Sequence, residues 1–198
     1  MKKINIIAVL LLLCTIPFVA VDAKKKKNQK DENPFGQTYS TPCEIYDSPT
    51  EFTANGIYTG PSRQMGEVQK YALENAQEIV RLKMKHAYKG MVSDYSSTHG
   101  NDKGNTLEKK ISSAGDRIID AVVNETMESC KSWSKIADDG SITCYVAIRI
   151  PKADLAQKVA KEVQNQLTQD EKDRINFNEQ EYRKQMEERF KKFQEGQQ

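Results

Sequence analysis

The feature that most limits the possible folds is an Asp-Gly turn between two apolar runs. Residues 138–141 (Asp-Asp-Gly-Ser) separate the runs 133–137 and 142–150. Asp-Gly between apolar runs favours a tight hairpin of two antiparallel strands, because Gly supplies the positive φ that such turns need. Along the second run, alternate residues share one apolar face: Ile142, Cys144, Val146, Ile148 and Ile150. The chain is therefore expected to contain an antiparallel sheet with one face on the core.

A third strand and a long helix are predicted before this hairpin. Residues 51–59 are strand-like, and Gly56 inside them predicts a bulge or the close approach of another backbone. The next segment has helical spacing, with a predicted buried face of Met65, Val68, Ala72, Ala76, Ile79, Leu82 and His86. Ala72 and Ala76 are small enough to let this helix lie close to the sheet. His86 is expected to be a partly buried structural histidine, because no second His or Cys stands at metal-ligand spacing.

The remaining elements complete an α+β pattern. Residues 93–105 are polar and predict a long loop, and Asn105 with Glu108 resembles a capping box for a second long helix that ends near residue 129. A further helix begins after Pro151 and carries Leu155, Val159, Val163 and Leu167. We therefore expect an α+β domain over residues 43–168. In it, a small antiparallel sheet of about three strands packs against two long helices.

Residues 169–198 predict a charged amphipathic C-terminal helix. The helix carries a narrow apolar stripe of Tyr182, Met186, Phe190 and Phe193. Its charge density favours an exposed helix that is dispensable for folding and uses this stripe for interaction. The alternative is that the stripe packs on the protein's own domain.

The N-terminus has the pattern of an export signal. Lys2 and Lys3 precede the apolar run 4–21, which favours a signal peptide over residues 1–23 that is cleaved after Ala23. The alternatives are an uncleaved membrane anchor and a lipid anchor at Cys14, which the large residue Leu13 before it disfavours. The protein is thus expected to be exported, to the periplasm or to an outer-membrane-associated site.

A flexible basic linker is predicted over residues 24–42. It begins with four consecutive lysines, Lys24, Lys25, Lys26 and Lys27. They are interpreted as solvated, and the alternative is contact with an anionic membrane surface.

Charge and motifs exclude several classes of function. Lys and Arg number 30 against 28 acidic residues, a net charge of +2, which argues against a nucleic-acid partner. The sequence contains no phosphate-binding Gly-rich loop, nucleophile elbow or Cys-x-x-Cys pair. Ser96, Ser97 and His99 lie close together, but they lack an orienting acid and an oxyanion hole. We therefore predict no catalytic residues, no cofactor and no metal site.

An ordered set of short segments resembles the twenty-kilodalton envelope lipoprotein family, which is related to the N-terminal domain of flagellar assembly protein T. The segments are Pro42-Cys43, residues 52–56 (Phe-Thr-Ala-Asn-Gly), residues 72–76 (Ala-Leu-Glu-Asn-Ala), Cys130 and residues 139–148 (Asp-Gly-Ser-Ile-Thr-Cys-Tyr-Val-Ala-Ile). The resemblance covers about residues 42–165. It implies helices packed on an antiparallel sheet in an exported or lipid-anchored envelope protein without established catalytic residues. The missing lipobox puts the lipid anchor in doubt.

These observations lead to an expected function and a set of site residues. The expectation is a non-enzymatic envelope protein that binds an envelope protein or an envelope surface. The alternative is a periplasmic module that binds a small envelope ligand on the sheet near Tyr58, Trp133 and Tyr145.

A disulfide between Cys43 and Cys130 is also predicted from the residues. Both cysteines stand at the ends of elements, whereas Cys144 alternates in phase with core residues and is expected to be a buried thiol.

Overall fold

The structure is a computed structural model that describes residues 40–99 and 104–195. The predicted signal peptide, Cys14, the lysines 24–27 and the linker up to residue 39 lie outside these residues. In chain order the elements are β1 (Glu51–Pro61), the 3-10 turn η1 (Ser62–Gln64), α2 (Met65–His99), α3 (Gly104–Glu125), β2 (Cys130–Trp133), β3 (Ser141–Pro151), α4 (Lys152–Gln166), α5 (Gln169–Arg174) and α6 (Glu179–Glu195). Within the described part, no helix has the length and apolarity needed to cross a membrane.

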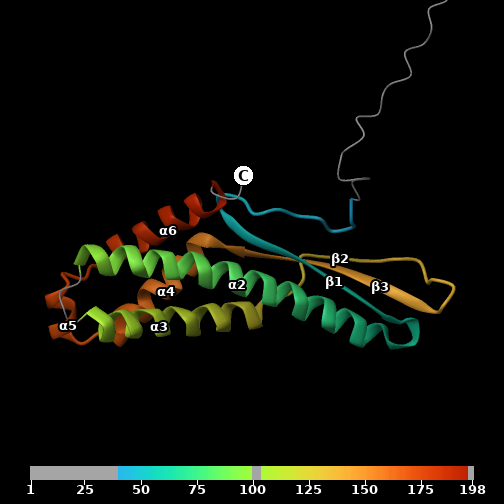
Figure 1. The fold of residues 1–198 in the computed structure, drawn as a ribbon, viewed down its shortest axis with the longest axis horizontal. Coiled ribbons are helices and arrows are strands. Elements are labelled where there is room, and N and C mark those ends of the chain that lie inside the picture. Colours follow the sequence, from blue (N-terminus) through green and yellow to red (C-terminus); the bar gives the residue numbers. More distant parts are fainter. Residues whose placement is uncertain (1–39, 100–103, 196–198) are drawn as a thin grey trace, which may run out of the picture. The chain divides into compact units, whose positions relative to one another are not determined.

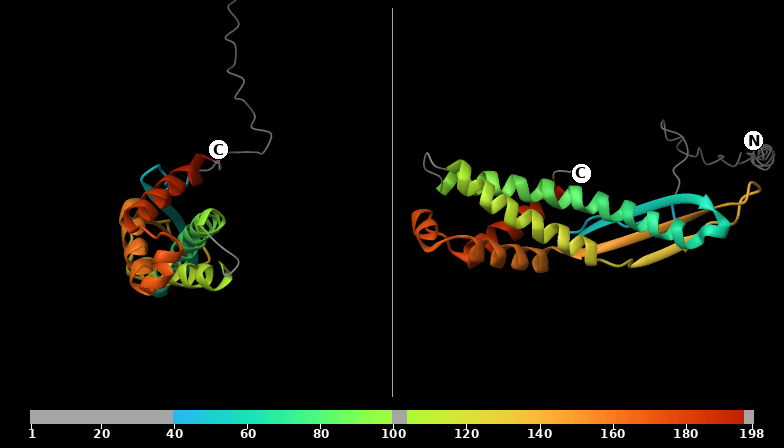
Figure 2. Two further views of the ribbon diagram at one scale, coloured as in Figure 1. Left: turned by 90° about the vertical axis from the view of Figure 1, so that its left-hand side faces the viewer. Right: turned by 90° about the horizontal axis from the view of Figure 1, so that it is seen from below.

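The predicted α+β class is confirmed (Figure 1). The strands form an antiparallel sheet in the order β1-β3-β2, with Phe52 opposite Ile150 and Gly60 opposite Ile142. Helix α2 lies along the sheet and then continues into a group of helices with α3, α4 and α6 (Figure 2). This one helix therefore belongs to both parts of the core.

The hairpin forms where the Asp-Gly turn predicts it, but its first strand is displaced. Gly140 has φ of 80°, and the amide of Ala137 donates to the carbonyl of Ser141 at 2.9 Å across the turn. Strand β2 ends at Trp133, so the prediction of a strand over 133–137 is wrong beyond its first residue. The chain after Trp133 keeps only isolated bonds to β3, such as Ser134 N to Thr143 O at 2.9 Å.

Gly56 marks the contact between sheet and helix. A Cβ atom built on Gly56 would lie 2.0 Å from the carbonyl oxygen of Ala72 and 2.9 Å from the Cβ of Ala76. The backbone of α2 therefore rests directly on β1, as the small residues predict. The pairing of β1 with β3 is continuous from Glu51 to Pro61, so there is no bulge.

The predicted buried face of α2 is correct at Val68, Ala72 and Ala76, and wrong at Met65, which is exposed, and beyond Ala76. Ile79, Leu82 and His86 are exposed. The buried face continues through a different set of residues: Val80, Met84, Ala87, Tyr88, Met91, Val92 and Tyr95. Both sets fit helical spacing, and the packing of α3 and α6 against the second half of α2 selects the latter set.

The predicted loop over 93–105 is also wrong in its first half, because α2 continues to His99. Tyr95 is buried on the inner side of the helix, while Ser97 and Thr98 are exposed. The hydroxyls of Ser97 and Thr98 donate to the carbonyl of Asp94 at 2.8 and 3.0 Å. Small polar side chains of this kind are tolerated on the solvent side of a helix when they bond the preceding turn. Residues 100–103 lie outside the described part.

Candidate functional site

The predicted interaction stripe of α6 is buried in the protein's own core. Tyr182, Met186 and Phe190 are 0% exposed, and Phe193 packs partly buried against the same core. The Phe190 ring meets the Phe52 ring of β1 edge-on with 5.1 Å between centroids. The prediction that this stripe binds a partner is therefore wrong, and the alternative of packing on the own domain holds. In place of the one predicted helix, the described chain has α5 (Gln169–Arg174) and α6 (Glu179–Glu195), which add a layer to the domain that was predicted to end at residue 168.

Buried tyrosines fasten the middle of α6. The Tyr88 hydroxyl donates to the carbonyl of Ile111 at 2.7 Å and lies 3.1 Å from the Tyr182 hydroxyl. The Tyr95 ring stands edge-on to the Tyr182 ring at 5.0 Å. Burial raises the pKa of both Tyr88 and Tyr182. Through these contacts the cluster holds α6 against α2 and α3.

Lys152 fastens the end of α6. Its ammonium group donates to the carbonyls of Ser48 and Phe190, each at 2.8 Å, and lies 4.7 Å from the centroid of the Phe52 ring. The residue is buried, and this burial lowers the pKa of its ammonium group. A buried charge is tolerated because both carbonyls and the ring face compensate it. Lys152 thus joins α4, α6, β1 and the segment before β1.

The predicted ligand groove at Tyr58, Trp133 and Tyr145 is not formed. Tyr58 and Trp133 both stand opposite Cys144 in the sheet, whereas Tyr145 stands opposite Ile57. Adjacent residues of a strand point to opposite faces, so Tyr145 lies on the other face from Tyr58 and Trp133. The three aromatic residues therefore do not line one surface.

The structure has a disulfide between Cys43 and Cys130, the pair predicted from sequence, with 5.6 Å between Cα atoms. Cys144 is a free, buried cysteine. Both arrangements agree with an oxidising compartment, in which a bridge can form and a buried thiol stays inert.

Residues 43–48, here called the strap, cross the sheet face that the helices leave open. At one end Asp47 accepts bonds from the amide and the hydroxyl of Thr53 on the edge strand β1, at 2.7 and 3.2 Å. Further along, the Asn55 amide nitrogen donates to the carbonyl of Ile45 at 2.8 Å. The disulfide at Cys43 is the other end. Asn55, Ala147 and Cys130 form one row across the three strands, so the strap spans the whole sheet.

Exposed apolar side chains gather along one side of α2. Tyr71, Ile79 and Leu82 are spaced for a single helical stripe and are all exposed. Tyr58 of β1 lies beside them, with its ring centroid 4.9 Å from that of Tyr71. We call Tyr58, Tyr71, Ile79 and Leu82 the α2 flank. The exposed polar residues Asn75 and Glu78 lie on the same side of α2 between Tyr71 and Ile79. Large apolar side chains that gather on one exposed side are candidates for an interaction site.

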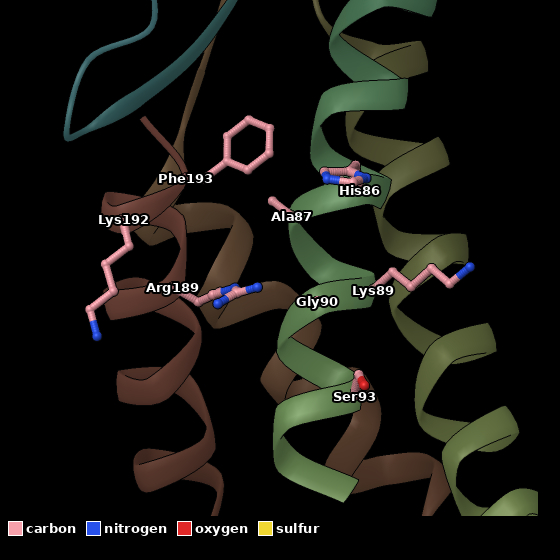
Figure 3. A pocket seen from close by; sticks show the side chains of 8 residues that line it. All are labelled: His86, Ala87, Lys89, Gly90, Ser93, Arg189, Lys192 and Phe193. Atoms are coloured by element: carbon pink, nitrogen blue, oxygen red, sulfur yellow. The ribbon is translucent and has the colours of Figure 1, made fainter. Parts of the chain in front are cut away.

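The same side of α2 continues into a cleft between α2 and α6. This helix cleft has a volume of about 620 Å³, and its walls carry His86, Lys89, Arg189 and Lys192 with the ring of Phe193 (Figure 3). The Phe193 ring lies 5.8 Å from the His86 ring. His86 is therefore exposed beside an aromatic ring, and the prediction of a partly buried histidine is wrong.

Sequence reasoning did not identify Gly90 and Arg189 as site residues. Gly90 is a glycine inside a helix, which is a signal that something approaches the backbone closely. A Cβ atom on Gly90 would lie 2.7 Å from Nη2 of Arg189, so the guanidinium group occupies the space that the missing side chain leaves. The partner of that glycine is set by tertiary packing alone.

Other chemical groups of the described residues do not converge on a site. Residues 40–99 and 104–195 contain no group of three or more His, Cys, Asp or Glu that could hold a metal ion. The Ser97 hydroxyl donates to the carbonyl of Asp94 in its own helix at 2.8 Å. No family model, no curated protein and no solved structure matches this chain.

Proposed function

We propose that this protein is an exported, non-enzymatic envelope protein that works by binding a partner protein through the α2 flank. The observation that carries the proposal is the exposure of Tyr71, Ile79 and Leu82 along one side of α2, with the Tyr58 ring against that of Tyr71. Burying such side chains against a partner is favourable by about 25 cal/mol per Å² of apolar surface. The flank takes the role that the sequence pattern assigned to the stripe of α6.

Two further observations support export. The apolar N-terminal run has the pattern of a cleaved signal peptide. The Cys43–Cys130 bridge belongs to the class of long-range structural disulfides that persist outside the cytoplasm. Intact-mass analysis of the exported protein should give a chain that begins at Lys24. A mass that retains Met1 in the exported fraction would contradict cleavage.

Photo-crosslinking in cells tests the binding surface. A benzoylphenylalanine at Leu82 probes the flank, and one at Ile136 is a matched control, because the two residues are 60% and 61% exposed. We expect a specific adduct from position 82 and none from position 136. Adducts of the same pattern from both positions, or none from position 82, would contradict the proposal.

A charge placed on the flank gives an independent test. Leu82→Asp should remove the adduct formed from a probe at Ile79, while the thermal midpoint stays unchanged because Leu82 is exposed. Ile136→Asp is the matched control and should leave the adduct intact. Loss of the adduct with both variants would show that the effect is not specific to the flank.

A further inference from the structure

We propose that the helix cleft binds an acidic segment of the partner protein. In the partner, this segment lies next to the apolar residues that bind the α2 flank. This inference rests on the proposed function, because it names the chemistry of the partner. The cleft begins where the flank ends: Leu82, His86 and Lys89 follow one another along α2 at helical spacing. A partner segment that covers the flank therefore reaches the cleft without a turn.

The charge of the cleft is the first support. Among the described side chains, its lining has the cations Lys89, Arg189 and Lys192 and no acidic residue, and Asp94 beside the lining residue Ser93 pairs with Arg189. Three cations against this one carboxylate leave an excess of positive charge, although the whole chain has a net charge of only +2. Such an excess attracts carboxylates and raises their rate of association.

The placement of Arg189 is the second support. Its guanidinium group reaches from α6 across the cleft to Gly90 on α2, where a larger residue would displace it (Figure 3). Nη1 of Arg189 already bonds the exposed carboxylate of Asp94 at 3.2 Å, so the group is held in a position where it can bind a carboxylate. The planar fork of arginine presents several N–H donors, which suits it to more than one carboxylate oxygen.

The surroundings of Arg189 favour a peptide over a flat membrane surface. The Phe193 ring, 6.1 Å from the Phe52 ring and 5.8 Å from the His86 ring, gives the cleft an apolar wall. Lys89 and Lys192 point away from the space between α2 and α6 on opposite sides, so that Arg189 is the cation between the two helices (Figure 3). An extended peptide can place an acidic side chain between the helices beside Arg189, whereas a flat bilayer surface reaches only the rim.

A labelled hexaglutamate peptide is the probe, measured by fluorescence anisotropy with the mature, disulfide-bonded chain 24–198. Arg189→Gln should weaken binding by about three- to tenfold, as expected for the loss of one charge-assisted contact. Arg183→Gln is the matched control, because Arg183 lies on the same helix, is 45% exposed against 44% for Arg189, and also bonds one carboxylate. Its affinity should stay within twofold of that of the wild type.

Gly90→Ala separates binding from folding. Its added methyl group forces the flexible end of Arg189 away from α2, while alanine is the better helix former. The thermal midpoint should stay unchanged or rise, and peptide affinity should fall by about as much as in Arg189→Gln. Unchanged affinity in both variants would overturn the proposal.

Two further arms separate the alternatives. Vesicles with anionic lipid that bind in an Arg189-dependent way, together with no peptide binding, would assign the cleft to a membrane surface and overturn the proposal. Leu82→Asn, which adds no charge beside the cleft, should reduce the crosslink of the α2 flank and leave hexaglutamate affinity within twofold. The proposed function fails if a probe at position 82 gives no adduct. The acidic-segment proposal fails if Arg189→Gln leaves the affinity for hexaglutamate unchanged, so the two failures are distinguishable.

Discussion

Two helices of this protein each carry an apolar stripe, and one stripe is buried while the other is exposed. The stripe of α6, with Tyr182, Met186 and Phe190, lies on a highly charged helix and is fully buried. The stripe of α2, with Ile79 and Leu82, lies on the central helix of the fold and is exposed. Helical spacing shows that a face exists, but the neighbouring elements decide which face they cover. A charged helix with a narrow stripe can still be part of the core when polar side chains fasten its middle and its end.

Deletion of residues 170–198 is the strongest test of whether the stripe of α6 belongs to the core. The truncation exposes Phe52 and Tyr88 and leaves the ammonium group of Lys152 without the carbonyl of Phe190. We expect the thermal midpoint to fall by more than about 8 °C, as a loss of several kcal/mol implies for a domain of this size. Circular dichroism melting measures the effect, and a chain ending at Glu195 is the control. A midpoint within about 2 °C of the wild type would restore the idea of a dispensable helix.

Alanine substitutions compare one residue from each stripe. Tyr182→Ala should reduce the free energy of unfolding by about 3–5 kcal/mol, because it opens a cavity and removes the partner of the Tyr88 hydroxyl. Leu82→Ala should change that free energy by less than about 0.5 kcal/mol, since the side chain is exposed. Chemical denaturation gives both values. Equal losses in the two variants would mean that both stripes are core.

Lys152→Met tests how the end of α6 is held. Methionine keeps the apolar stem but leaves the carbonyls of Ser48 and Phe190 without their donor. We expect a loss of about 2 kcal/mol in the free energy of unfolding, within the range for hydrogen bonds to charged groups. Lys158→Met, at an exposed position of the same helix, is the control. A Lys152→Met protein that is more stable than the wild type would show that burying the ammonium group costs more free energy than its hydrogen bonds contribute.

Among the contacts that hold the C-terminal helices, the smallest loss is expected at α5, the short helix that leads the chain to α6. Glu171 closes a capping box with Thr168 and bonds Lys110. Lys110 first, and then Thr168, lower the pKa of Glu171 from 4.5 to about 2. Glu171→Gln should cost about 1 kcal/mol at pH 7.

The pH dependence of that cost has a defined sign. A carboxyl group whose pKa is lower in the folded state adds stability above the unfolded value of 4.5 and loses it as the pH falls toward about 2. The difference in unfolding free energy between wild type and Glu171→Gln should therefore shrink over this range. Urea denaturation at several pH values measures it, and a difference independent of pH would contradict the assignment.

Local patterns predicted the parts of the fold that depend on neighbours in sequence. The Asp-Gly turn and the alternation along β3 follow from short-range stereochemistry, and Gly56 indicated the close approach of another backbone without naming which one. The face of α2 beyond Ala76 could not be predicted in this way, because two sets of residues fit the same helical period. The helix cleft could not be predicted either, because Gly90 and Arg189 lie far apart in the chain and only tertiary packing brings them together.

The strap also determines how the protein responds to tension. Cys43 and Cys130 are 87 positions apart in sequence, and the bridge between them closes the chain into a covalent ring. A force between the N-terminus and the C-terminus passes from Cys43 directly to Cys130, so the backbone inside the ring is not stretched. Full extension of the oxidised protein can thus release only the chain outside the ring. Reduction of the bridge adds roughly 300 Å of contour length, at about 3.5 Å per residue. The disulfide therefore keeps the backbone of β1, α2 and α3 from being extended, even after β3, α4 and α6 have been pulled away from them.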